Sequence, residues 1–232
     1  MSVRHKSGFN KKYSVYVGLA YLTYTFLGLV NSFVVKPGIK NMDTFLQTAD
    51  SYRLAQALDL AMYCVVIVAA WASYLLARCY NKDFALLAFL FRFGEGLLGC
   101  VALMIALMPL LLLDSSIILA GFDGEQLRTL STLFIKLSDR TWYILFVPMG
   151  LGAFLFVFLF YRAKYVAGWL CYWGMFTYFS MTVVGFAKIA MASMPQWLIY
   201  FMYPGALFEL VFGIYMLAIG LRKEIEPAVN AP

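Results

Sequence analysis

Three ionisable residues lie inside stretches of the sequence that are otherwise long and apolar. Arg92 and Glu95 belong to "ALLAFLFRFGEGLLGCVALMIALMPLLLL", and Glu209 belongs to "YPGALFELVFGIYMLAIG". A charge at the centre of a membrane-spanning helix costs roughly 2.5 to 3.5 kcal/mol, so these side chains are expected to face protein or water and not lipid. In such a place an arginine can hold an anionic or polar ligand, and a carboxylate can exchange a proton.

The position of each charge along its segment groups five residues into one candidate site. With a rise of about 1.5 Å per residue, Glu95 and Glu209 come close to the middle of the membrane, and Asp59 and Lys188 come closer to its outer boundary. We predict that Glu95 and Glu209 form the core of a site for a small polar ligand or a proton, reached from the outer side. Arg92 is expected to contact Glu95, Glu209 or both. Asp59 and Lys188 are further candidate binding residues.

Two structural interpretations compete with this site. Arg92, Glu95 and Glu209 can form a Glu-Arg-Glu knot that only fixes the register of the helices. Lys188 can extend its amino group to the membrane surface without binding anything. The sequence leaves these alternatives open.

Small or hydroxyl-bearing residues accompany the charges at helical spacing, which predicts close helix packing or room for water or a ligand. The motif "GEGLLG" satisfies GxGxxG, but its glycines lie in the middle of an apolar segment and follow no strand, so we expect a packing face and not a dinucleotide site. The three stripes are Ala88, Arg92, Glu95, Gly99, Ala102 and Ala106; Gly205, Glu209 and Gly213; and Gly18, Tyr21, Thr25, Gly28 and Ser32.

The elements that must position these residues are six apolar segments. The chain is 63% hydrophobic and 13% charged, with a mean hydropathy of +0.80, which indicates an integral membrane protein. Each segment approaches the roughly 20 residues that cross a bilayer as a helix. We predict an all-α fold, a single six-helix transmembrane domain over 13–222 between short tails at 1–12 and 223–232. The segments are 13–35, 54–78, 84–113, 141–162, 167–192 and 197–221.

Charge asymmetry predicts the orientation of this bundle. Placing both termini in the cytoplasm assigns ten Lys and Arg residues to that side and six to the outer side, in line with the positive-inside rule. The outer connections 36–53 and 114–140 carry apolar residues at helical spacing. They are predicted either as two helices on the outer membrane surface or as ordered loops.

Several classes of function are disfavoured by what the sequence lacks. The basic residues lie at the ends of apolar segments and form no basic face, so no nucleic-acid partner is expected. The four cysteines form no CxxC motif and the only histidine is His5, so no metal site is expected. HExxH and GxSxG are absent, which makes an enzyme the less favoured class. No cofactor can be assigned from the sequence.

Four blocks together resemble a known family. They are "SYRLAQALDLAMY", "FALLAFLFRFGEG", "YRAKYVAGWLCYWG" and "YPGALFELVFGIYMLAIGLR", and the similarity runs from about Tyr13 to Arg222. In order, they closely resemble a bacterial six-helix membrane family catalogued as domain of unknown function forty-three eighty-six. The resemblance implies a bacterial inner (cytoplasmic) membrane and an all-helical bundle, but no reaction. It maps the family's polar positions onto Arg53 and Asp59, Arg92 and Glu95, and Phe208 and Glu209.

Two hypotheses for the function follow, with a third behind them. The first is a small transport or ligand-binding bundle that uses the central Arg and carboxylates on a proton or a small polar ligand. The second is a non-catalytic accessory subunit of a membrane complex, in which the polar knot is structural. The third is an enzyme acting on a lipid or quinone. A cavity reaching Glu95 or Glu209 would favour the first hypothesis, and a dry, fully paired cluster would favour the second.

Overall fold

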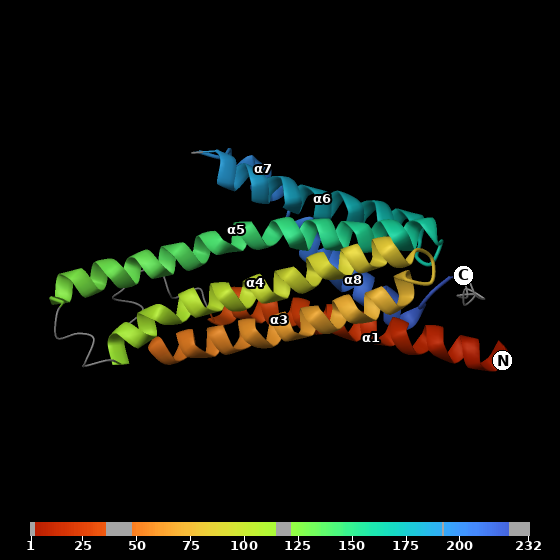
Figure 1. Ribbon diagram of the computed structural model, residues 1–232, viewed down its shortest axis with the longest axis horizontal. Helices are drawn as coiled ribbons and strands as arrows, with labels where there is room; N and C mark the ends of the chain where they lie inside the picture. Colours follow the sequence, from red (N-terminus) through yellow and green to blue (C-terminus); the bar gives the residue numbers. More distant parts are fainter. Residues whose placement is uncertain (1–2, 36–47, 115–121, 192, 223–232) are drawn as a thin grey trace.

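The computed structural model describes residues 3–35, 48–114, 122–191 and 193–222 of the chain, and every regular element in these ranges is a helix. This confirms the predicted all-α class. Figure 1 shows the helices as a bundle of long rods lying side by side. The elements are α1 (Val3–Val30), the π-helical turn η1 (Asn31–Val35), α3 (Ala49–Ala77), α4 (Lys82–Asp114), α5 (Gly124–Arg162), α6 (Gly168–Ala190), α7 (Trp197–Tyr200) and α8 (Pro204–Ala218).

Six stretches of these helices are long and apolar enough to cross a membrane, as the sequence predicts. Each long helix packs against the next along the chain, and α8 packs back against α1, so that α1, α3, α4, α5, α6 and α8 form a closed ring of neighbours. The inner faces of the ring are therefore screened from lipid. This arrangement is what allows ionisable side chains to lie at membrane depth.

The start of α1 and the end of α8 lie at the same end of the bundle. The Ser14 hydroxyl donates a hydrogen bond to the Met216 carbonyl at 2.8 Å, and the Arg222 amide donates to the Tyr165 carbonyl in the α5–α6 turn at 2.8 Å. We call this end proximal. The opposite end, where α3 and α5 begin, is the distal end (Figure 1).

Helix α5 corrects one part of the predicted fold. The apolar spacing in the outer connection 114–140 suggests a separate surface helix, but Gly124–Arg162 is one continuous helix of 39 residues, about 58 Å long. It begins with a capping box, in which the Asp123 side chain accepts from the Gln126 amide and the Gln126 side chain accepts from the Asp123 amide. No glycine or proline interrupts the helix before Pro148, so nothing separates the two predicted pieces.

The other predicted surface helix lies largely outside the described residues, because 36–47 are not among them. Its last residues, from Ala49, already belong to α3. The predicted tail at 1–12 is helical from Val3 onward, and the tail at 223–232 lies outside the described residues.

The sixth span is broken near its distal end. Helix α7 ends at Tyr200, and α8 begins at Pro204, which occupies the first turn, where a proline costs no hydrogen bond. The sequence predicts one helix over 197–221 with a kink at Pro204, and the structure has a break there. The 15 residues of α8 are about 22 Å long, so this helix alone is shorter than the hydrocarbon core.

Glycines allow the helices around the centre to approach closely. A Cβ atom added to Gly99 of α4 would lie 2.4 Å from the Tyr63 ring of α3. One added to Gly152 of α5 would lie 2.8 Å from Cγ of Arg92 on α4. Close packing of this kind drives the association of helices in a membrane, because hydrophobic burial contributes little free energy to association in lipid. The prediction that "GEGLLG" contributes a packing face is consistent with the fit of Gly99 against α3.

Candidate functional site

Arg92 and Glu95 form a buried ion pair one turn apart on α4. Nη1 of Arg92 donates to Oε2 of Glu95 at 2.6 Å, and the two residues are 1% and 5% exposed. Both lie on the inner face of the ring, and the opposite face of α4 presents larger apolar residues to the outside. The predicted contact between Arg92 and Glu95 is therefore present.

Glu209 is held differently, by hydroxyl groups from two neighbouring helices. Its Oε1 accepts from the Tyr24 hydroxyl of α1 at 2.9 Å and from the Tyr178 hydroxyl of α6 at 3.2 Å. Its Oε2 accepts from the Thr25 hydroxyl at 3.0 Å. No ion pair joins Arg92 to Glu209 among the described residues. Glu209 is thus a buried carboxylate with three hydroxyl donors and, among the described residues, no ion pair.

Tyr24 connects the Arg92–Glu95 ion pair to Glu209. The guanidinium carbon of Arg92 lies 5.8 Å from the centroid of the Tyr24 ring, whose hydroxyl donates to Glu209. A cation over an aromatic face is attracted by the ring's electrons. Nη2 of Arg92 is buried and has no hydrogen-bond partner among the residues that the structure describes. We refer to Tyr24, Arg92, Glu95, Tyr178 and Glu209 as the central cluster.

Asp59 lies apart from the central cluster, on the inner face of α3. It is 6% exposed, and its Oδ1 accepts from the side-chain amide of Asn31 at 2.6 Å. The same amide donates to the Ala55 carbonyl at 2.9 Å. Asn31 belongs to η1, so the π-helical turn brings this residue to the inside, whereas the predicted Ser32 is exposed.

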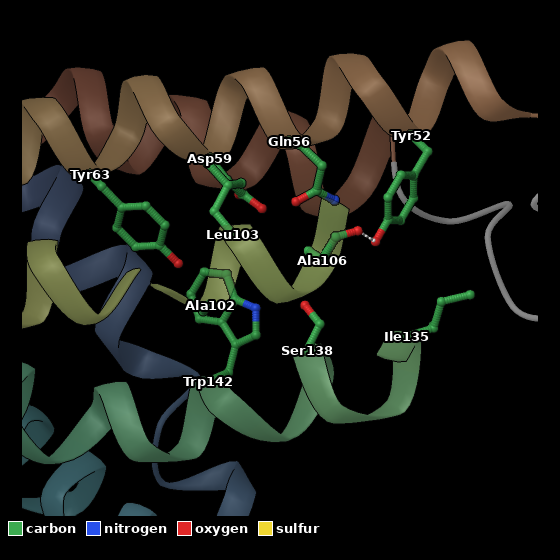
Figure 2. Close-up of a pocket in the computed structure, with 10 residues that line it drawn as sticks. All are labelled: Tyr52, Gln56, Asp59, Tyr63, Ala102, Leu103, Ala106, Ile135, Ser138 and Trp142. Atoms are coloured by element: carbon green, nitrogen blue, oxygen red, sulfur yellow. Dashed lines mark hydrogen bonds between the residues drawn. The ribbon is translucent and has the colours of Figure 1, made fainter. Parts of the chain in front are cut away.

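A cavity of about 220 Å³ opens between the distal halves of α3, α4 and α5, and we call it the distal pocket. Figure 2 shows Gln56 and Asp59 extending into it from α3, and Ser138 and Trp142 from α5. Tyr63 lines its inner side. The Tyr63 ring packs on Gly99, which lies one turn beyond Glu95, about 6 Å along α4. The distal pocket therefore approaches the central cluster, although neither Glu95 nor Glu209 lines it.

Lys188 lies away from both the central cluster and the distal pocket. Its side chain is exposed near the end of α6, and its amino group lies 5.1 Å from the centroid of the Tyr143 ring on α5. The structure brings it neither to the central cluster nor to the lining of the distal pocket. Its role in binding stays a prediction.

The sequence interpretation placed Thr25 on an interior stripe and Asp59 in the candidate site, but it missed Tyr24 and Tyr178 as partners of Glu209 and the other polar residues that line the distal pocket. Tyr24 and Tyr178 are both buried in the folded structure, each on the inner face of its helix. A tyrosine at an inward-facing position is the signal by which the sequence could have indicated them. With 16 tyrosines in the chain, that signal does not single them out. Asn31 was missed because the π-helical turn shifts the buried face by one residue.

The chemistry open to this arrangement is proton exchange and the binding of a polar or charged group. A carboxylate accepts hydrogen bonds when ionised and can donate one when protonated, and a hydroxyl group can adapt to either state. No group of three or more His, Cys, Asp or Glu side chains that could hold a metal ion lies together in the part of the chain that the structure describes.

The fold and the central cluster define a multi-pass α-helical membrane protein with a charged interior. A family model described as "Domain of unknown function (DUF4386)" matches residues 16–220, and the chain belongs to that family. The resemblance seen in the sequence blocks is thereby confirmed. No curated protein and no solved structure matched the chain in the same comparisons.

Proposed function

We propose that this protein is a small transport bundle that binds a proton, or a small polar ligand together with a proton, at the central cluster. The observation that carries the proposal is the separation of the two carboxylates. In a purely structural Glu-Arg-Glu knot, Arg92 would bridge both acids. Instead, in the part of the chain that the structure describes, Arg92 forms its ion pair with Glu95, and the hydrogen bonds to Glu209 come from hydroxyl groups.

The charge of the cluster favours proton binding at Glu209. With both carboxylates ionised, one guanidinium faces two negative charges inside the membrane, where an uncompensated charge is costly. Binding a proton at Glu209 removes that excess. The hydroxyl groups of Tyr24, Thr25 and Tyr178 can reorient to hold the protonated form, because each can accept a hydrogen bond as well as donate one.

The distal pocket supports access from one side of the membrane. It extends inward to Tyr63, whose ring packs on Gly99, one turn from Glu95. The Lys and Arg asymmetry of the sequence predicts that this end of the bundle faces the outside. A proton or ligand would enter past Asp59 and reach the central cluster after a local movement of Tyr63.

Proton uptake by proteoliposomes tests the proposal. The purified protein is reconstituted with a pH indicator trapped inside, and a potassium diffusion potential drives protons inward. We expect faster uptake than in protein-free vesicles, and a rate close to that of protein-free vesicles for Glu209→Gln, which keeps the shape of the side chain but cannot ionise. Asp50→Asn is the matched control, because Asp50 is exposed at the start of α3.

Two results would reject the proposal. One is uptake by the parent no faster than that of protein-free vesicles. The other is equal uptake by Glu209→Gln and the parent while Glu209→Leu only lowers the unfolding temperature. In that second case the carboxylate is structural, and the accessory-subunit hypothesis replaces transport.

A further inference from the structure

Four exposed cations at the proximal end of the bundle have no anionic partner. They lie in the turns that join α3 to α4 and α5 to α6, and just after α8. None of them forms an ion pair among the residues that the structure describes. Asp83 is the only acidic side chain described at this end. We call the four the proximal basic surface, and they are Arg78, Arg162, Lys164 and Arg222.

Contacts between the two turns and the end of α8 hold this surface together. The Arg162 guanidinium, at the end of α5, lies beside the Tyr80 hydroxyl in the α3–α4 turn. The Arg222 amide donates to the Tyr165 carbonyl at 2.8 Å, which fixes the chain after α8 against the α5–α6 turn. Figure 1 shows both turns and the end of α8 at the same end of the bundle. The cations therefore form one surface.

Lys164 has a backbone conformation that a lysine seldom adopts. Its φ is +59°, and no other residue except glycine has a positive φ in the described part of the chain. Just past α5, the Tyr165 amide donates to the Phe160 carbonyl and the Lys164 amide to the Tyr161 carbonyl. This is the Schellman motif, whose left-handed position is usually glycine. A cation thus occupies a position that glycine would fill with less strain, which points to a role for its charge.

Exposed aromatic side chains mark the depth of this surface in the membrane. Tyr80, Trp169 and Tyr172 are all exposed, and they flank the two turns. The hydroxyls of Tyr161 and Tyr172 lie 2.7 Å apart, so that α5 and α6 present their polar groups together. Tryptophan and tyrosine prefer the boundary between hydrocarbon and water. The cations beside them therefore lie at the level of the lipid phosphates.

The phosphate of an anionic lipid is the ligand that this surface suits. An arginine can bind two phosphate oxygens at once, and a lysine adds a compact charge with further N–H donors. A zwitterionic headgroup carries an ammonium group that these cations repel, whereas the headgroup of phosphatidylglycerol carries none. Each Lys or Arg near the surface of an anionic membrane strengthens binding by about fivefold.

We propose that the proximal basic surface binds the headgroup of an anionic phospholipid, with Arg162 and Lys164 as its main phosphate ligands. The inference goes beyond the transport proposed above and does not depend on it, because it concerns exposed side chains at the end of the bundle and not the buried central cluster.

Native mass spectrometry of the purified protein in detergent tests the inference. Phosphatidylglycerol and phosphatidylcholine with identical acyl chains are added in equal amounts, and the ratio in which the folded protein retains them is measured. We expect about tenfold or more phosphatidylglycerol over phosphatidylcholine. Glycerol phosphate at the same concentration, which has the phosphate but no acyl chains, should not lower this ratio.

Three variants assign the preference to the surface. Arg162→Gln and Lys164→Gly should each lower the lipid ratio about fivefold. Arg140→Gln, the same change at another exposed position of α5, should leave the ratio unchanged. Because glycine suits a φ of +59°, Lys164→Gly should unfold in lipid-free detergent at the temperature of the parent or above it. Its loss of lipid preference then cannot come from misfolding.

Each of four results would overturn the inference. The first is equal retention of the two lipids by the parent. The second is a parental ratio in Arg162→Gln or in Lys164→Gly, which would mean that the residue only completes the end of α5. The third is an equal loss in Arg140→Gln, which would indicate a general effect of charge. The fourth is competition by glycerol phosphate, which would indicate a site for a soluble phosphate.

Discussion

Breaking the Arg92–Glu95 pair is the perturbation whose effect on stability follows most directly from the geometry. The pair is joined at 2.6 Å and almost fully buried. Removing one member leaves the other as an uncompensated buried charge, which costs about 3–5 kcal/mol. We expect Arg92→Met and Glu95→Gln each to lose about this much free energy of unfolding. Arg92→Lys should lose less, because it keeps the charge.

The double variant makes this prediction quantitative. With both charges removed, neither member of the pair is left as a buried ion without the other, so the double variant should lose clearly less than the sum of the two single losses. Unfolding in mixed micelles, followed by tryptophan fluorescence, gives the four free energies of the cycle. Losses that add to within about 0.5 kcal/mol would mean that the two residues do not interact in the folded protein, and would refute the reasoning.

Three further predictions concern packing, helix capping and orientation. Gly99→Ala should destabilise the bundle by about 1–3 kcal/mol, because the added methyl meets an aromatic ring at 2.4 Å, whereas Gly94→Ala, with nothing within 4 Å, should be neutral or stabilising. Asp123→Ala should cost about 0.5–2 kcal/mol in local unfolding at the start of α5, seen as faster amide exchange there, and Asp123→Asn much less. In a background without cysteines, Thr129→Cys should react with a membrane-impermeant maleimide in intact cells, and Tyr80→Cys only after permeabilisation; the reverse pattern would invert the proposed orientation.

The sequence predicted the membrane class and the number of spans because both depend on local composition. The predicted ends of the helices were less accurate, because tertiary structure and not local composition decides where a helix ends. The separate surface helix in the connection 114–140 was predicted from apolar residues at helical spacing, and that spacing does not show where one helix ends and the next begins when no breaker lies between them. The break before Pro204 was predicted only as a kink, because a proline marks the position of an irregularity and not its extent.

The site was predictable only where the contact is local. Arg92 and Glu95 are three residues apart on one helix, so their pairing follows from helical geometry. The partners of Glu209 come from α1 and α6, more than 30 residues away along the chain, as the separations of 185 to Tyr24 and 31 to Tyr178 indicate. Only the rotation of each helix within the ring decides which hydroxyls reach it. The distal pocket depends on how side chains of three helices fill space, and no periodicity carries that information.

The central claim is that Glu209 exchanges a proton with the aqueous phase, and infrared difference spectroscopy tests it most directly. Spectra of the reconstituted protein at high and low pH are subtracted, and the carbonyl stretch of a protonated carboxyl group is followed in ordinary and heavy water. We expect a band that appears on acidification, shifts in heavy water and is missing from Glu209→Gln. A difference spectrum that is identical in Glu209→Gln and the parent would contradict the claim.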